Sequence, residues 1–144
     1  MDDKAPPAVN RSQRMRLAPY SLTEYNSHNG DLVEPRFNLW LEVDGAVALS
    51  AWRVALLEAV AETGSITAAA ERMNIGYRQA WAKLRECEER LGVPLVETTV
   101  GGSGGGGAQL TPAADDLLAR YHAFSAGLDE IVEQRFRSVF GPQG

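Results

Sequence analysis

Apolar residues recur every three or four positions along three consecutive stretches in the middle of the chain, 51–63, 66–73 and 77–91. This spacing is typical of helices with one buried side. We expect the buried sides to contain Leu56, Leu57 and Val60 in the first helix, Ile66, Ala69, Ala70 and Met73 in the second, and Ala80, Leu84, Cys87 and Leu91 in the third. Only the brief turn 74–76 joins the last two helices, which resembles a helix-turn-helix.

The ends of these helices carry residues that start and stop helices. Ser50 and Ser65 stand where a side-chain oxygen can accept a hydrogen bond from an amide of the first turn. Gly64 and Gly92 stand where a helix can end in the left-handed conformation, and Pro94 prevents the third helix from resuming.

Apolar and polar residues alternate along 36–43, which predicts a β-strand with one buried face. The face expected to be buried consists of Phe37, Leu39, Leu41 and Val43. Asp44 and Gly45 form a tight-turn pair, so we expect 46–49 to return as a short second strand.

A second hairpin is predicted after the third helix, with strands at 95–100 and 108–110 around a glycine-rich loop. Six glycines and one serine fill 101–107. On this interpretation the loop is the tip of a wing, either a passive turn or a backbone that approaches a phosphate or a minor groove closely. The candidate contacts at the tip are Gly102, Ser103, Gly104 and Gly105. A nucleotide-binding loop would need a lysine and a hydroxyl after the glycines, and neither is present.

The last helix is predicted to run unbroken from Pro112 to about Val139, with Thr111 as its cap. About 28 residues would extend roughly 42 Å, which is too long for this domain alone. Its apolar stripe therefore predicts contact with the equivalent helix of a second chain, or with another partner. The candidate dimerisation residues are Leu117, Tyr121, Phe124, Leu128, Ile131, Val132 and Phe136.

The composition limits the class of protein and its expected location. The chain has 144 residues and one cysteine, and no apolar run long enough to span a membrane or to act as a secretion signal. We therefore expect a cytoplasmic protein without a disulfide. Residues 1–35 are polar and contain four prolines, so we interpret them as a flexible, solvated arm, although Arg11, Arg14 and Arg16 could meet an acidic partner. The predicted organisation is this arm, a domain at 36–126 and a helical extension at 127–144.

Charge is distributed unevenly along the chain. The net charge is −5, yet the start of the third helix, 76–85, holds three positive residues and no acid. Arg78 is suited to reading a guanine edge, and Gln79 can also donate to base edges, whereas Lys83 and Arg85 are suited to phosphate. The alternative is an amphipathic helix whose charged side is simply solvated.

Catalytic and metal-binding chemistry is not indicated. His28 and His122 have no nearby ligand partners in the sequence, and we can assemble no nucleophile–base pair or paired carboxylates. We expect neither an enzyme nor a cofactor.

Three segments, "LWLEVDG", "ETGSITAAAERMNIGYRQAW" and "PLVETTVGGSGGGGAQLT", resemble the N-terminal DNA-binding domain of ModE-type, molybdate-responsive regulators over about residues 36–125. LysR-type regulators share "AETGSITAAAERMNI" and "RLGVPLVE", but usually lack the glycine wing and "YRQAW". The resemblance implies a winged helix-turn-helix that dimerises through flanking helices. It also implies that Thr67, Tyr77, Arg78, Gln79, Lys83 and the wing lie near DNA.

Three departures from the ModE pattern change what is expected. The chain ends at Gly144, where the family has a C-terminal oxyanion-binding domain, so sensing of molybdate by that route is not expected. Ser103 stands where the wing often has a basic residue, which should weaken attraction to phosphate. Gly76 stands where a serine often caps the reading helix, a change that costs only a few tenths of a kcal/mol.

The sequence therefore predicts a mainly helical protein with a small β wing, a winged helix-turn-helix with a long C-terminal dimerisation helix. Its predicted function is that of a homodimeric transcriptional regulator bound to double-stranded DNA at a palindromic operator. One alternative is a protein-interaction module that kept this fold without binding DNA. Another is an enzyme that uses the glycine loop for a phosphorylated substrate.

Overall fold

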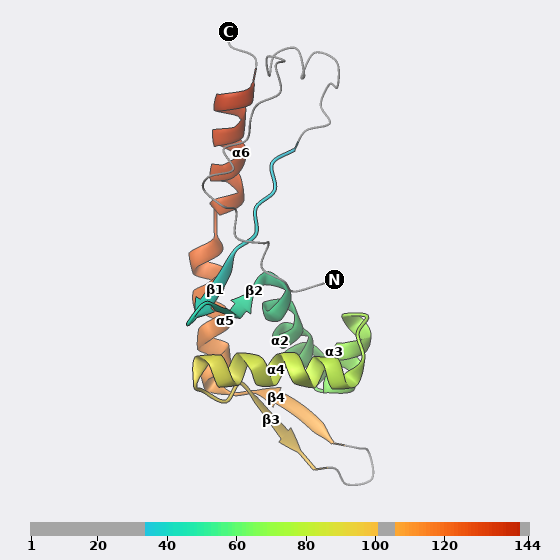
Figure 1. Ribbon diagram of the computed structural model, residues 1–144. Helices are drawn as coiled ribbons and strands as arrows, with labels where there is room; N and C mark the ends of the chain where they lie inside the picture. The colour runs from blue at the N-terminus through green and yellow to red at the C-terminus, as the bar shows by residue number, and fades with distance from the viewer. Residues whose placement is uncertain (1–33, 101–105, 142–144) are drawn as a thin grey trace. The chain divides into compact units, whose positions relative to one another are not determined.

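The computed structural model describes residues 34–100 and 106–141 (Figure 1). The predictions for the N-terminal arm up to residue 33 and for Gly102, Ser103, Gly104 and Gly105 lie outside the described residues. The elements are β1 (Trp40–Val43), β2 (Ala46–Ser50), α2 (Ala51–Thr63), α3 (Ile66–Arg72), α4 (Tyr77–Leu91), β3 (Val96–Thr99), β4 (Gly107–Leu110), α5 (Pro112–Ser125) and α6 (Leu128–Phe140).

The described residues form two compact units, one spanning 38–124 and the other containing 34–37 and 125–141. The first unit contains the three predicted helices and both hairpins. Within the described ranges, every helix is too short or too polar to traverse a bilayer.

The predicted ends of α2, α3 and α4 are confirmed. Ser50 and Ser65 each accept a hydrogen bond from the backbone amide three residues later, at 3.2 Å. Gly64 and Gly92 follow α2 and α4 with φ angles of 68° and 70°. A side chain at such positive φ is strained, which is why glycine suits both positions.

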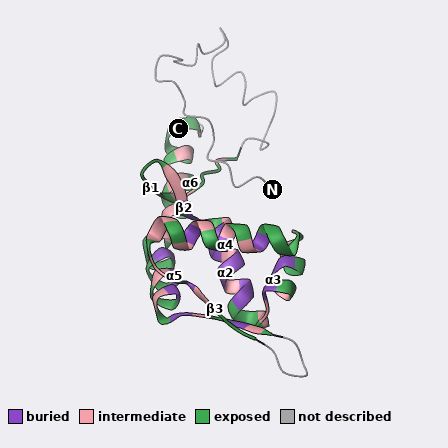
Figure 2. Ribbon diagram, turned by 60° about the horizontal axis from the view of Figure 1, so that its bottom comes forward, coloured by how far each residue is buried: buried purple, intermediate pink, exposed green. Residues whose placement is uncertain are grey.

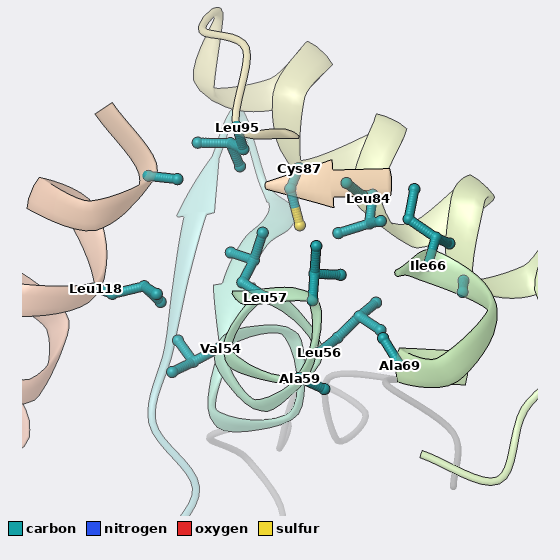
Figure 3. Close-up of a cluster of buried hydrophobic side chains, with 14 of the residues drawn as sticks. Val54, Leu56, Leu57, Ala59, Ile66, Ala69, Leu84, Cys87, Leu95 and Leu118 are labelled. Carbon is teal, nitrogen blue, oxygen red and sulfur yellow. The ribbon is translucent and has the colours of Figure 1, made fainter. Parts of the chain in front are cut away.

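The core of the first unit is built by α2, α3 and α4 with residues of β2, β4 and α5 (Figures 2 and 3). Of the side of α4 that was predicted to be buried, Ala80, Leu84 and Cys87 are each at most 1% exposed, and Leu91 is partly buried against the core. The largest fully buried side chains are Leu49, Leu56, Leu57, Val60, Leu84, Cys87 and Leu95. The outer side of α4 is left to face solvent.

The first hairpin forms as predicted, but its buried face does not. β1 pairs antiparallel with β2, and Asp44 and Gly45 take positive φ angles in the turn. Leu41 and Val43 are nevertheless 36% and 37% exposed, and Phe37 is 41% exposed. The expected burial of these three residues is wrong, because β2 supplies the apolar side chains that reach the core and β1 lies outside it.

The wing is an antiparallel pair of strands that is attached firmly at its base. β3 and β4 are in register from Val96 opposite Leu110 to Thr99 opposite Gly107. The Ala108 amide donates to the Gly64 carbonyl at 2.9 Å, which joins β4 to the turn between α2 and α3. The predicted strands are therefore present, and their described residues are fixed to the helix-turn-helix.

The predicted continuous last helix is wrong, because the chain forms two helices, α5 and α6. The break falls at Gly127, whose φ of 77° is left-handed. A left-handed residue cannot continue an α-helix, and glycine adopts that conformation without a steric penalty. The apolar stripe continues through the break in the sequence, which is why periodicity alone did not reveal it.

The two helices also use their apolar residues differently. Tyr121 of α5 is only 6% exposed, and its hydroxyl donates to the Leu39 carbonyl at 3.1 Å within the first unit. Leu117 packs against the same core. In contrast, none of the residues of α6 is buried, and Ile131 and Val139 are each 57% exposed.

Candidate nucleic-acid interface

The first half of α4 presents polar and cationic side chains to solvent. Tyr77, Arg78, Gln79 and Arg85 are exposed, and the two arginines lie on the side away from the buried apolar residues. None of the ion pairs recorded within 34–100 and 106–141 involves Arg78. Gly76 precedes the helix without a side-chain hydrogen bond to its first turn. Both the exposed cation and the open amide end of the helix favour a negatively charged partner.

Arg85 forms part of an aromatic row along α4. Its guanidinium carbon lies 5.3 Å from the ring centroid of Trp81, a cation–π distance. Tyr77, one turn earlier, meets the same indole edge to face at 6.4 Å between centroids. The row orients Arg85 on the exposed side, and Trp81 also packs partly against the core.

Lys83 is less available than its position in the sequence suggests. Its ammonium nitrogen lies 3.6 Å from a carboxylate oxygen of Glu86, and its side chain is only 26% exposed. The charge that was predicted to meet phosphate is therefore already offset in part by a neighbouring acid.

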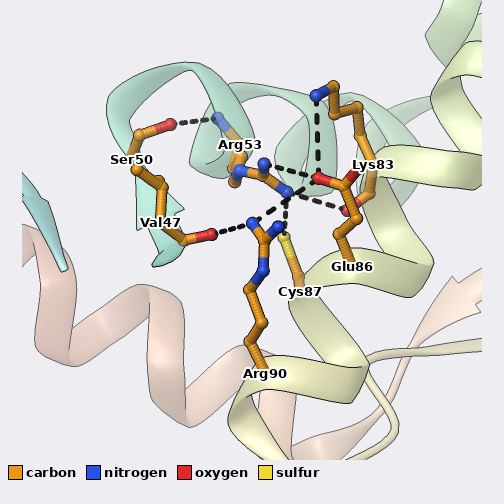
Figure 4. Close-up of polar contacts among 7 residues, drawn as sticks. All are labelled: Val47, Ser50, Arg53, Lys83, Glu86, Cys87 and Arg90. Carbon is orange, nitrogen blue, oxygen red and sulfur yellow. Dashed lines mark hydrogen bonds and ion pairs between the residues drawn. The ribbon is translucent and has the colours of Figure 1, made fainter. Parts of the chain in front are cut away.

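A buried arginine behind α4 was missed by the sequence analysis. Arg53 of α2 is 2% exposed. It donates to a carboxylate oxygen of Glu86 at 2.8 Å and to the Lys83 carbonyl at 3.1 Å, and it lies 3.4 Å from the Cys87 sulfur (Figure 4). These contacts attach the middle of α4 to α2. A sequence signal existed, since position 53 falls in the same helical stripe as 56, 57 and 60.

Glu86 is surrounded by three cations. Besides Arg53, the nitrogens of Lys83 and Arg90 each lie 3.6 Å from its carboxylate, and Arg90 also donates to the Val47 carbonyl. Burial by itself raises the pKa of the Glu86 carboxyl, but the hydrogen bond from Arg53 and the three positive charges outweigh burial, so the pKa lies below its ordinary value. The carboxylate is therefore held in its charged form.

A hollow of about 280 Å³ lies between the start of α3, the start of α4 and the wing. It brings two predicted site residues, Thr67 and Tyr77, to the same place as Thr98 and Thr99 of β3. The two wing threonines were not among the predicted contacts. Gln79 and Arg78 lie on the exposed side of α4, and the wing-tip residues fall outside the described ranges.

Known proteins of two kinds are similar to this domain. The model of the bacterial regulatory helix-turn-helix proteins of the lysR family matches residues 53–115. Molybdenum-pterin-binding protein MopB of Rhodobacter capsulatus is 41% identical over 99 residues, which are 69% of this chain and 36% of that protein. Molybdenum transport protein ModE of Herbaspirillum seropedicae is 49% identical over 65 residues, 45% of this chain and 24% of that protein.

The fold is a helix-turn-helix domain with a β wing, and its residues 53–115 are similar to the helix-turn-helix of the lysR family. The predicted resemblance to ModE-type regulators is confirmed by the two relatives, of which the chain spans only 24% and 36%. Among solved structures, the CbnR DBD from a crystal structure of its complex with DNA is 27% identical, with a TM-score of 0.45 over 60% of this chain and 92% of that chain.

Proposed function

We propose that this protein is a transcriptional regulator that binds double-stranded DNA in a sequence-specific way. The observation that carries the proposal is α4, whose apolar side is buried while Arg78 and Gln79 stand exposed near its open start. A helix of this kind enters the major groove and places such side chains against base edges. As a bacterial regulator, it would act in the cytoplasm, where the DNA is.

The net negative charge is compatible with this proposal because the acids of α4 come only in its later turns, from Glu86 on, and five more acids lie on α5 and α6. Asp115 and Asp116 are on α5, and Asp129, Glu130 and Glu133 are on α6. The first ten positions of the predicted reading segment, 76–85, have no acid. A local excess of positive charge is what phosphate attraction requires.

Fluorescence anisotropy with duplex DNA at two salt concentrations tests the proposed function. A regulator of this type should prefer its own promoter sequence over an unrelated duplex and should lose affinity steeply as salt rises. A protein-interaction module on the same fold would show neither behaviour.

We expect Arg78→Ala to weaken binding to the preferred sequence by about 1–3 kcal/mol and to relax the preference at one base pair. The reason is that a guanidinium can donate two hydrogen bonds to guanine. Competition binding with single-base variants of the site measures both effects. Arg137→Ala removes one positive charge from the side of α6 away from the apolar stripe and serves as the control; equal losses for the two variants would remove Arg78 from the reading set.

We further propose that the regulator is a homodimer that binds a palindromic operator. Apolar side chains are exposed at the end of the first unit, where Phe124 is 60% exposed, and on α6, where Ile131 is 57% exposed. Leu128, Val132 and Phe136 continue the α6 stripe at helical spacing. Tyr121 and Leu117 are used inside the first unit, so the proposed interface consists of Phe124, Leu128, Ile131, Val132 and Phe136.

A stop after Phe124 is expected to leave monomers, because it removes α6 and its exposed apolar stripe. In the full chain, Ile131→Glu should have the same effect by placing a charge within the stripe. Sedimentation equilibrium measures the mass in each case. Gln134→Glu adds the same charge to the other side of α6 and should leave the dimer intact; dimers that persist in the truncated chain would move the interface elsewhere.

A further inference from the structure

The hollow between α4 and the wing has an unusual chemical composition for a surface that meets DNA. Its lining includes four residues that bear a hydroxyl group, Thr67, Thr98, Thr99 and Tyr77, together with Gly106 and Gly107. Among the described residues that line it, none carries a formal charge. The hollow therefore offers hydrogen-bond donors without cations.

The residues that bear these hydroxyl groups are accessible to a ligand from outside. The Thr99 hydroxyl oxygen accepts a hydrogen bond from the Gly107 amide at 3.1 Å, which leaves its own proton to donate. Tyr77 is 50% exposed, and both Thr67 and Thr98 are exposed. A Cβ at position 107 would lie 3.1 Å from the same Thr99 oxygen, so glycine keeps this strand close to the threonine.

We propose that this hollow seats one sugar–phosphate strand of the DNA and holds it through uncharged hydroxyl donors. The inference rests on the proposed function. If α4 lies in a major groove and the wing in the neighbouring minor groove, the strand that separates the two grooves passes between these elements. Hydroxyl groups of Thr and Tyr are regular partners of phosphate oxygens, and such contacts fix the position of a protein on the duplex without reading its sequence.

The absence of cations from these walls gives the proposal a distinct signature. A lysine or arginine that neutralises a phosphate releases counterions, so its removal lowers the salt dependence of binding. A neutral hydroxyl contributes a hydrogen bond without neutralising the phosphate charge. Loss of such a hydroxyl should therefore lower affinity equally for all sequences and leave the salt dependence unchanged.

The test uses the full chain with Thr98→Val and Thr67→Val, one variant from each wall of the hollow. Each replacement keeps a branched side chain and removes the hydroxyl. We expect each to weaken binding by about tenfold to preferred and unrelated duplexes alike, with the slope of log affinity against log salt as in the unchanged protein. Thr98→Ser retains the hydroxyl and should restore affinity, and Ser138→Ala on α6 is the control for hydroxyl loss elsewhere.

A second measurement identifies the partner of the hydroxyl. Methylphosphonate groups replace phosphates one at a time along the duplex. At one position this replacement should lower the affinity of the unchanged protein for DNA but cause no further loss of affinity in Thr98→Val. Variants that bind as tightly as the unchanged protein, or that change the salt slope, overturn the inference while leaving the proposed function standing. Failure of the unchanged protein to bind any duplex overturns both.

Discussion

Replacement of Glu86 by glutamine is expected to lower the free energy of unfolding by about 3 kcal/mol. Glutamine keeps the shape and an acceptor oxygen, but it removes the charge that faces the guanidinium of Arg53 at 2.8 Å. Arg53 is 2% exposed and cannot lose its proton to adapt. We place the effect at the lower end of the range for a broken buried pair, because the Glu86 side chain is itself 35% exposed.

Matched variants test whether the cost comes from leaving the buried cation without its acid. Arg53→Met removes the buried cation and fills much of its volume, while Glu86 retains Lys83 and Arg90 at 3.6 Å. It should therefore cost less than Glu86→Gln, because no buried charge is left without its acid. Glu89→Gln changes an exposed acid of the same helix and should have almost no effect. Urea unfolding measures all three, and equal costs for Glu86→Gln and Glu89→Gln would contradict the prediction.

The same pair predicts a dependence on pH. The pKa of Glu86 is lowered in the folded protein, so its contribution to stability is complete above the ordinary pKa of 4.5 and is lost as the pH falls through the lower folded value. Acid should therefore reduce the stability of the unchanged protein more than that of Glu86→Gln. The difference between the two urea midpoints should narrow below pH 4.5.

Much of the fold was predictable because its signals are local. A serine cap, a glycine in the left-handed conformation and a helical stripe each act within one or two turns of the chain. Ser50, Ser65, Gly64 and Gly92 therefore mark the ends of α2, α3 and α4 where the structure has them. The wing strands follow from the same kind of evidence.

Features that depend on distant contacts were not predictable in the same way. The alternation along β1 shows that Leu41 and Val43 share a face, but it cannot show what covers that face. The burial of Arg53 depends on Glu86, which lies 33 positions further along the chain. The break at Gly127 was lost because the apolar stripe resumes in phase after it.

The candidate site likewise contains residues that could be predicted from local sequence and residues that could not. Arg78 and Gln79 were identified because a charged, acid-free segment on one side of a helix is visible in the sequence. The hollow was not identified, because Thr98 and Thr99 reach Thr67 and Tyr77 only after the wing is joined to the turn at Gly64.

Leu84→Ala is expected to destabilise the first unit by about 2–5 kcal/mol, through lost apolar burial and the cavity left behind. Leu84 is 1% exposed and lies on the side of α4 that faces the core, among its fully buried side chains. Leu41→Ala is the control. That leucine is 36% exposed, so its replacement removes less buried apolar surface and should lower the free energy of unfolding much less. Urea unfolding of the two variants measures the difference, and similar losses would contradict the assigned core.

The comparison of Leu84→Ala with Arg78→Ala separates the contribution of α4 to folding stability from its contribution to DNA binding. Both residues are on the same helix, but one faces the core and the other faces solvent. Arg78→Ala should change stability by less than about 0.5 kcal/mol, as is usual for surface positions, while DNA binding falls. Leu84→Ala should bind DNA normally per folded molecule at low temperature and lose binding only as it unfolds. If Leu84→Ala lost affinity while fully folded, the position of α4 on the core would itself set the affinity for DNA.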